Sequence, residues 1–303
     1  MTIVSNLSVA GPRPRADEHS ADAQRTADIS ADAAPPRRWR VEDIDFSHIE
    51  HSRIHDNEAL FYLLTSASFI ESGSDLYTSN LVGHYADYPE VADWLRGHWE
   101  HEELQHGRAF AAYVQAAWPQ FPWQRAFEGF IAEYGPMCNV DELEDDRTLE
   151  LAARCVVETG TTTYYQTLRG LSEEPVLTEL LGHIRADEVS HYKHFLGYFK
   201  QLRAQRPVAR TRVAKVVYRR LLELRESDAD VALRHVWAHK GDMFADGANR
   251  FDEISQRVSR LVSSRLPADQ AVRMLLKPLM LPRRVESWIE RPLERLARRV
   301  IAA

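Results

Sequence analysis

The sequence has few cysteines and no long apolar run. Only 2 of its 303 residues are Cys, too few for a disulfide framework or a thiolate metal site and compatible with a reducing compartment. No stretch reaches the roughly 18 consecutive apolar residues that a membrane-spanning helix needs. The N-terminus also lacks the continuous apolar segment of a secretory signal peptide. These absences favour a cytoplasmic protein without a membrane span.

The sequence also lacks strand patterns and nucleotide fingerprints. No run of Val, Ile or Thr alternates with polar residues at a period of two. From residue 57 to residue 200, positions three and four apart instead form one stripe in each of four segments. The stripes are Leu60, Leu64, Ala67, Glu71 and Ser74; Trp99, Glu103, His106, Phe110 and Tyr113; Leu151, Cys155, Glu158, Thr162 and Tyr165; and Leu177, Leu181, Ile184, Glu188, His191, Phe195 and Tyr198. Such stripes predict an all-α four-helix bundle.

Prolines mark the ends of the predicted helices. Pro89 and Pro175 suit the first turns of the second and fourth helices, because proline lacks the N–H that a first turn leaves unpaired. Pro119 and Pro122 close the second helix, and we expect a short helix within residues 121–134.

Composition divides the chain into three parts. Residues 1–40 are almost free of aromatic residues and are expected to form a disordered arm. Residues 41–205 contain the predicted bundle. Residues 206–303 are a basic region with 21 Lys and Arg against 12 Asp and Glu. Its additional C-terminal helices are predicted at 208–226, 228–245, 249–262, 267–278 and 283–300.

The inward stripes carry carboxylates. Each of the four predicted helices places one glutamate in its stripe, and two of these glutamates are followed three residues later by a histidine on the same helix face. The two Glu…Glu-x-x-His units repeat with an offset of 85 to 87 residues. The six residues are Glu71, Glu103, His106, Glu158, Glu188 and His191. Four Glu and two His around a bundle axis form the ligand set of a two-metal carboxylate centre.

A metal centre accounts for acids in an apolar stripe. Burying four unpaired carboxylates is costly, and two cations that neutralise them convert the cluster into a binding site. Oxygen and imidazole ligands suit iron, with manganese at one site as an alternative. The competing interpretation is that these residues are solvated faces of charged helices.

Neighbouring polar residues are weaker candidates. Glu58 lies close to the start of its predicted helix, where a carboxylate favours the helix dipole. His98 and His101 fall on other faces of the second helix and are expected to be exposed. His194 could contact a ligand histidine, although an exposed position is the alternative.

The motifs resemble those of a known family. Glu102-Glu103-x-x-His106-Gly107 and Asp187-Glu188-x-x-His191 are similar to the two motifs of soluble acyl-carrier-protein desaturases, which are ferritin-like non-haem di-iron enzymes. Glu158-Thr-Gly-Thr161 is similar to the Glu-x-x-Thr on their third ligand helix. The resemblance covers residues 57–200 and implies a ferritin-like bundle.

The resemblance also implies roles for individual residues. The six striped Glu and His residues would be the metal ligands. Asp187 and Glu102 would hold the outer nitrogens of the ligand histidines. Thr161, or Thr162 on the stripe, could hand protons to bound oxygen, unless either residue is simply a small side chain that lets helices approach. Gly107 would permit close packing beside a ligand.

Related families differ at single positions. Ferritins supply one histidine where this sequence has two, which favours oxygen activation over storage. Ribonucleotide reductase small subunits carry a radical tyrosine one turn after the first ligand histidine, and Phe110 occupies that position here.

The implied function is an O2-dependent di-iron oxidase or oxygenase acting on a C–H or an amine, by desaturation, hydroxylation or N-oxygenation. The aromatic stripe residues, namely Phe110, Tyr113, Tyr165, Phe195 and Tyr198, would line its cavity.

Partners follow from the same hypothesis. Electrons would come from a ferredoxin- or flavin-type reductase, because the chain has no nucleotide fingerprint. The basic C-terminal region would bind an acidic acyl-carrier protein or an anionic membrane surface, or would pack as a lid over the bundle. We expect no nucleic-acid partner, and a homodimer is compatible with the sequence. The alternatives to the oxidase are a ferritin-like metal-storage or peroxide-detoxifying protein and a purely structural helical protein.

Overall fold

The computed structural model describes residues 39–138, 143–223, 228–244 and 250–302, and every regular element within them is helical. The all-α prediction is therefore confirmed for the described residues. The expected disordered arm at 1–40 lies almost entirely outside them. Residues 40–303 cluster into one compact unit, and the division at residue 205 stays a prediction.

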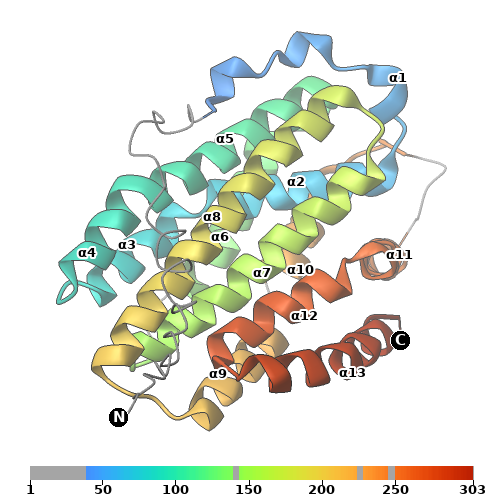
Figure 1. Ribbon diagram of the computed structural model, residues 1–303. Coiled ribbons are helices and arrows are strands. Elements are labelled where there is room, and N and C mark those ends of the chain that lie inside the picture. Colours follow the sequence, from blue (N-terminus) through green and yellow to red (C-terminus); the bar gives the residue numbers. More distant parts are fainter. Residues whose placement is uncertain (1–38, 139–142, 224–227, 245–249, 303) are drawn as a thin grey trace, which may run out of the picture. The chain divides into compact units, whose positions relative to one another are not determined.

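Four long helices form the bundle (Figure 1). They are α2 (Glu58–Ser72), α5 (Glu100–Ala117), α7 (Arg147–Leu171) and α8 (Pro175–Gln205). α2 packs against α5 and α7 packs against α8, so the bundle consists of two helix pairs. All four predicted stripes are buried along their length except at Tyr198, which is half-buried. Their apolar members make up much of the core, as the spacing predicts.

The start of α8 shows how polar groups are placed inside this core. Pro175 occupies the first turn, as predicted, and Glu174 is the N-cap residue. Its carboxylate accepts hydrogen bonds from the backbone N–H of Val176 (3.2 Å) and of Leu177 (2.7 Å). It also accepts one from the hydroxyl of Tyr113 at 2.9 Å. These donors satisfy a carboxylate that is fully buried.

The second predicted helix is interrupted in the structure. α4 (Pro89–Trp94) begins at Pro89 as predicted, but a π-helical turn, Leu95–Trp99, separates it from α5. The first helix also ends earlier than its stripe. α2 stops at Ser72, Gly73 follows, and Ser74 lies buried at the start of α3 (Asp75–His84). Neither break follows from the spacing of apolar residues.

Shorter helices surround the bundle. The expected helix within 121–134 is α6 (Trp123–Tyr134), and the five predicted C-terminal helices are present with shifted ends. α10 packs on α2 and α6, α9 and α12 pack on α7, and α13 packs on α12. The C-terminal helices are α9 (Arg210–Glu223), α10 (Asp228–His239), α11 (Phe251–Arg265), α12 (Ala268–Leu276) and α13 (Arg283–Ala302). The remaining short helices are α1 (His51–Ile54) and the single turns Val41–Asp43, Phe46–His48, Gly135–Met137 and Lys277–Leu279.

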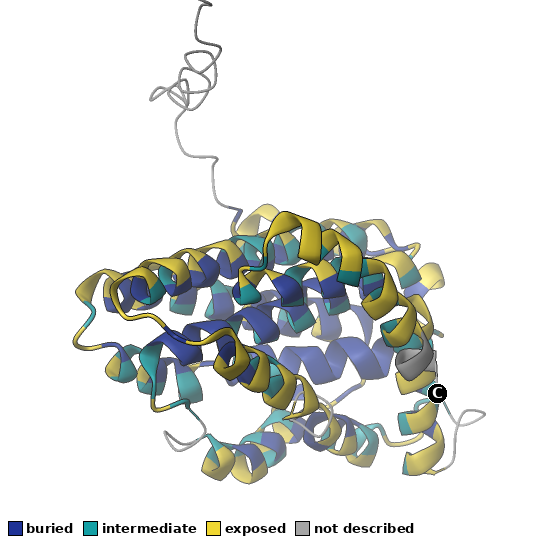
Figure 2. Cartoon of the chain, turned by 60° about the horizontal axis from the view of Figure 1, so that its bottom comes forward, coloured by how far each residue is buried: buried dark blue, intermediate teal, exposed yellow. Residues whose placement is uncertain are grey.

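Burial follows this layering. Figure 2 shows buried residues along the inward faces of the helices and exposed residues on the outward ones. None of the described helices is both long enough and apolar enough to span a membrane.

Candidate metal centre

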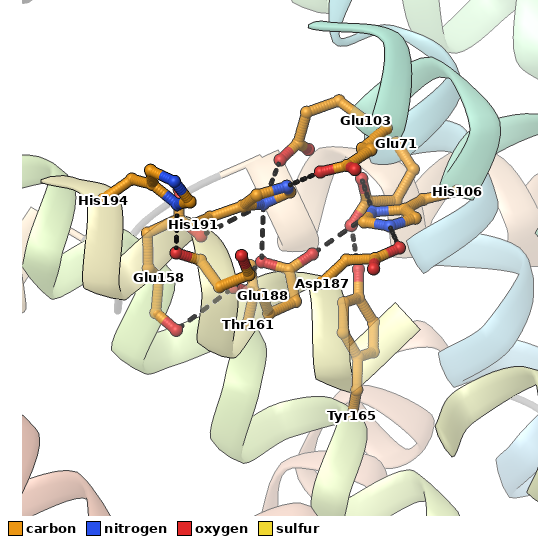
Figure 3. A network of polar contacts seen from close by, with 12 residues as sticks. Glu71, Glu103, His106, Glu158, Thr161, Tyr165, Asp187, Glu188, His191 and His194 are labelled. Carbon is orange, nitrogen blue, oxygen red and sulfur yellow. Dashed lines mark hydrogen bonds and ion pairs between the residues drawn. The ribbon is translucent and has the colours of Figure 1, made fainter. Parts of the chain in front are cut away.

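Six acidic and imidazole side chains meet in the middle of the bundle (Figure 3). Each is at most 5% exposed, and together they come from all four bundle helices. They form two groups whose ligand atoms all lie within 4.8 Å of one another, and two glutamates belong to both groups. The first group is Glu71, Glu103, His106 and Glu188, and the second is Glu103, Glu158, Glu188 and His191. The structure therefore brings together all six residues that the stripes single out.

The outer nitrogen of each histidine contacts an acid from the opposite helix pair. Nε2 of His106 on α5 lies 3.1 Å from Oδ2 of Asp187 on α8. Nε2 of His191 on α8 lies 2.9 Å from Oε2 of Glu102 on α5. The two acids expected to orient the histidines are thus in contact with them, and the contacts cross between the helix pairs. Such a contact fixes which imidazole nitrogen carries the proton.

The inner nitrogens point into the cluster. Nδ1 of His106 lies 3.3 Å from Oε1 of Glu188. Nδ1 of His191 lies 3.2 Å from Oε1 of Glu103 and 3.7 Å from Oε2 of Glu158. Both imidazoles therefore direct Nδ1 toward carboxylates of the cluster. Two cations bound there would contact these nitrogens and the carboxylates together.

Burial and crowding shift the pKa values of the cluster. Burial raises the pKa of Glu158 to about 8, and burial followed by repulsion from neighbouring carboxylates raises that of Glu71. Burial opposes ionisation of Glu188 as well, but contacts with His106 and His191 lower its pKa to about 2. Burial disfavours the protonated histidines, yet hydrogen bonds to the acids raise both of their pKa values well above 6.5. The raised pKa values mean that, without a metal, bound protons offset part of the negative charge of the cluster.

The donor set fits two metal cations. Oε2 of Glu158 and Nδ1 of His191 are buried and make no well-aligned hydrogen bond. Buried polar atoms of this kind are costly, and a cation between the carboxylates would satisfy both of them. Oxygen and imidazole donors favour iron or manganese over metals that prefer thiolates.

Hydroxyl groups contact the carboxylates from α7. Oγ1 of Thr161 donates to Oε2 of Glu188 at 2.5 Å, whereas Thr162 is fully buried and its Oγ1 has no hydrogen-bond partner among the described residues. The hydroxyl of Tyr165 donates to Oε1 of Glu71. The stripe predicts that Tyr165 faces inward, but its spacing carries no information on which carboxylate the hydroxyl reaches.

The described contacts of two aromatic stripe residues, Tyr113 and Tyr198, are with residues outside the six-residue cluster. Tyr113 donates to Glu174 at the end of the bundle, and Tyr198 packs on Trp94 with ring centroids 5.7 Å apart. Trp94, which belongs to no predicted stripe, and Trp99, which begins the second stripe, both lie against His191. The rings of Trp94 and Trp99 lie 6.3 and 6.5 Å from the imidazole of His191, both edge-on.

The weaker candidates lie outside the cluster. His98 and His101 are exposed, as expected. His194 is also exposed and stacks on Trp94 with ring centroids 4.8 Å apart. Glu58 is the first residue of α2. None of these four belongs to either ligand group among the described residues.

Close helix packing supports the cluster at Gly107. A Cβ atom added there would lie 2.7 Å from the Cα and N atoms of Ser72, the residue after Glu71. No side chain fits at that distance without moving the α2 backbone. Gly107 therefore allows α2 and α5 to approach each other beside Glu71 and His106, as its position next to His106 predicts.

No protein-family model and no curated protein sequence matches the chain. Solved structures of R2-like ligand-binding oxidases are similar to it. A variant with a Mn/Fe cofactor and another with a Fe/Fe cofactor each have a TM-score of 0.48 and 14% identity, covering 75% of this chain and 87% of theirs. A further Mn/Fe structure has a TM-score of 0.43 and 14% identity, covering 92% of this chain and 89% of its own. Identities this low do not transfer a function.

Proposed function

We propose that this protein is an O2-dependent, non-haem di-iron oxidoreductase. The observation that carries the proposal is the pair of overlapping ligand groups, each with three carboxylates and one imidazole. A single cation would leave part of the acid cluster uncompensated, whereas two cations engage all six residues. Two histidines, one for each group, also set the cluster apart from an array of acids alone.

Each ion would take ligands from both helix pairs. Glu71 and His106 would help to hold one ion, and Glu158 and His191 the other. Glu103 and Glu188 belong to both groups and would help to hold either ion. Two ferrous ions, or iron with manganese at one site, supply the redox chemistry that reduces O2 when they are bound.

The surrounding residues prepare the ligands for this chemistry. Asp187 and Glu102 keep a proton on Nε2 of their histidines, which leaves the lone pair of Nδ1 directed at the centre. The hydroxyl of Thr161 contacts Glu188 at 2.5 Å and is placed to pass a proton to or from that carboxylate. Burial of the whole cluster excludes bulk water.

The substrate class rests on the sequence resemblance. We propose a desaturase-like or hydroxylase-like oxidation of a C–H bond, or oxidation of an amine, in a carrier-bound acyl chain or a similar small molecule. Full reduction of both oxygen atoms of O2, to two waters in desaturation or to one water and a product oxygen in hydroxylation or N-oxygenation, consumes four electrons. The substrate supplies two of them, and a ferredoxin- or flavin-type reductase supplies the other two.

Anaerobic iron loading followed by O2 tests the proposal. We expect about two ferrous ions per chain and a transient visible absorption after mixing with O2 in a stopped-flow instrument. Glu103→Ala is expected to abolish this absorption because it removes a ligand of both ions. His101→Ala, on the exposed side of the same helix, is the matched control and is expected to leave it unchanged. Many more ions per chain would instead indicate storage, and a folded protein that binds no iron would exclude the proposal.

A further inference from the structure

Helix α13 presents an apolar and basic surface to solvent. We define the α13 outer face by its side chains that point away from the rest of the protein. Val285, Trp288 and Leu296 are 42%, 79% and 55% exposed. The full set is Val285, Trp288, Pro292 and Leu296 with Arg284, Arg291 and Arg295, all of them exposed. In Figure 2 the helix that ends at the C label is mostly in the colour of exposed residues.

The carboxylates of α13 point the other way. Glu286 pairs with Lys277 at 2.6 Å and Glu290 with Arg273 at 3.6 Å. Both pairs tie α13 to the preceding helical segment. The third carboxylate, Glu294, is engaged by Arg298 of the same helix at 2.9 Å. The outer face therefore carries positive charge with no acid among its described side chains.

The arginines of the outer face are available to a partner. Arg284, Arg291 and Arg295 form no ion pair with a described residue. They flank an apolar stripe whose members are three or four residues apart, which is the spacing of one helix face. Ile289, at one edge of this stripe, and Ala297 are half-buried, whereas the stripe itself is exposed. The described part of the protein therefore leaves the stripe open to solvent.

We propose that the α13 outer face binds the surface of an anionic phospholipid bilayer. The helix would lie in the plane of the headgroups, with Trp288 at the boundary of the acyl region and the arginines on lipid phosphates. Complementary charge favours an anionic surface. The highly exposed indole of Trp288 favours lipid over an acidic carrier protein, because lipid chains conform around a protruding side chain whereas a folded partner needs a matching pocket.

Vesicle flotation of the full-length, metal-loaded protein tests the proposal. Vesicles of phosphatidylcholine alone are compared with vesicles that also contain phosphatidylglycerol. We expect binding only to the anionic vesicles, weakening at high salt because the attraction is screened. Tryptophan emission is expected to shift to shorter wavelength on binding. This shift should be absent from Trp288→Ala, whose affinity is expected to fall about tenfold.

A matched pair of double variants separates a local effect from net charge. Arg291→Gln with Arg295→Gln is expected to weaken binding about thirtyfold, since each arginine near an anionic surface contributes about a factor of five. Arg260→Gln with Arg265→Gln removes the same charge from exposed positions on α11 and is expected to keep most of the binding. Equal losses in the two pairs, no binding of the parent protein to anionic vesicles, or an unchanged emission shift in Trp288→Ala would each overturn the proposal. So would a dimer that Trp288→Ala dissociates, or an acidic carrier protein that binds this face when vesicles do not.

Discussion

Two acids that are not in either ligand group contact the outer nitrogens of the imidazoles. Asp187 and Glu102 each hold a histidine that lies on the opposite helix pair. A neutral amide of the same size still fills the space, but it holds the N–H of the imidazole less strongly and can present its own donor to that nitrogen. The contact therefore matters through its charge as well as through its shape.

Asp187→Asn is expected to lower the affinity for ferrous ion by about 10–100-fold, the range typical of such supporting residues. Competition with a chromophoric chelator measures this change. Asp93→Asn on α4 is the control, because that exposed carboxylate contacts only Arg96 among the described side chains. Equal affinities of Asp187→Asn and the parent protein would show that the contact does not orient His106.

Neighbouring tyrosines on α7 offer a second comparison. Tyr165→Phe removes the hydroxyl that donates to the buried Glu71 carboxyl group. It is expected to destabilise the metal-free protein by about 1–3 kcal/mol, because Glu71 then lacks that donor. Tyr164→Phe removes a hydroxyl that donates to the backbone carbonyl of Leu63 at 3.2 Å from a half-buried position. Its expected effect is smaller, about 1 kcal/mol. Chemical denaturation measures both, and equal effects would assign Tyr165 no special role at Glu71.

Among the helices, the π-helical turn Leu95–Trp99 explains how Trp94, which belongs to no predicted stripe, contacts His191. Trp94 and Trp99 are five residues apart, which in an α-helix places them on different faces. A turn with i→i+5 hydrogen bonds brings both indoles to the same imidazole, that of His191. Periodicity of 3.6 residues cannot reveal such a turn, because it assumes regular winding throughout.

The close contact between α2 and α5 at Gly107 leads to a prediction about helix packing. Gly107→Ala is expected to destabilise the protein by about 1–3 kcal/mol, as overpacking does, and to lower iron affinity by separating Glu71 from His106. Gly197→Ala on α8 is the control, since nothing lies within 4 Å of the added Cβ, and it is expected to stabilise the helix slightly. Thermal unfolding and iron titration measure both variants. A Gly107→Ala protein as stable as the parent would contradict the close approach.

For the whole molecule, the cluster makes stability depend on pH. The pKa of Glu158 is about 8 in the folded protein against an ordinary value of 4.5. Between these values the folded state holds a proton that the unfolded chain has released, so stability falls as pH rises. The raised pKa values of His106 and His191 act in the same direction above pH 6.5. The lowered pKa of Glu188 has the opposite effect on stability. The stability that it contributes is lost only as the pH falls from 4.5 toward about 2.

We therefore expect the melting temperature of the metal-free protein to fall from about pH 5 to about pH 8. Glu158→Gln should flatten this dependence, because its amide does not titrate. Bound divalent ions displace the protons, so the stabilisation that they add should grow over the same range. Melting curves with a chelator and with excess zinc, which is redox-inert, test both statements. A melting temperature that rises with pH in the presence of the chelator would contradict the protonated cluster.

Most of the bundle and the six clustered residues could be predicted from the sequence, because helical spacing determines which side chains face inward. The break at Gly73, the π-helical turn and the contact between Tyr165 and Glu71 could not. They depend on backbone winding and on side-chain reach, which the order of residues alone does not specify. Tyr113 illustrates the limit, since it lies on the inward stripe but bonds to Glu174 at the end of the bundle. The inward direction of a side chain determines neither its hydrogen-bond partner nor its position along the bundle axis.

The sharing of Glu103 and Glu188 by both ligand groups has a thermodynamic consequence. An ion in either group acts on carboxylates that the other group also uses, so the two occupancies are linked. Linkage of this kind is reciprocal: the factor by which the first ion changes the affinity for the second must equal the factor in the reverse order. Filling one position with zinc and titrating the other with manganese, and then exchanging the order, closes a thermodynamic cycle. The two ion positions would thus be coupled through the two glutamates that both groups contain.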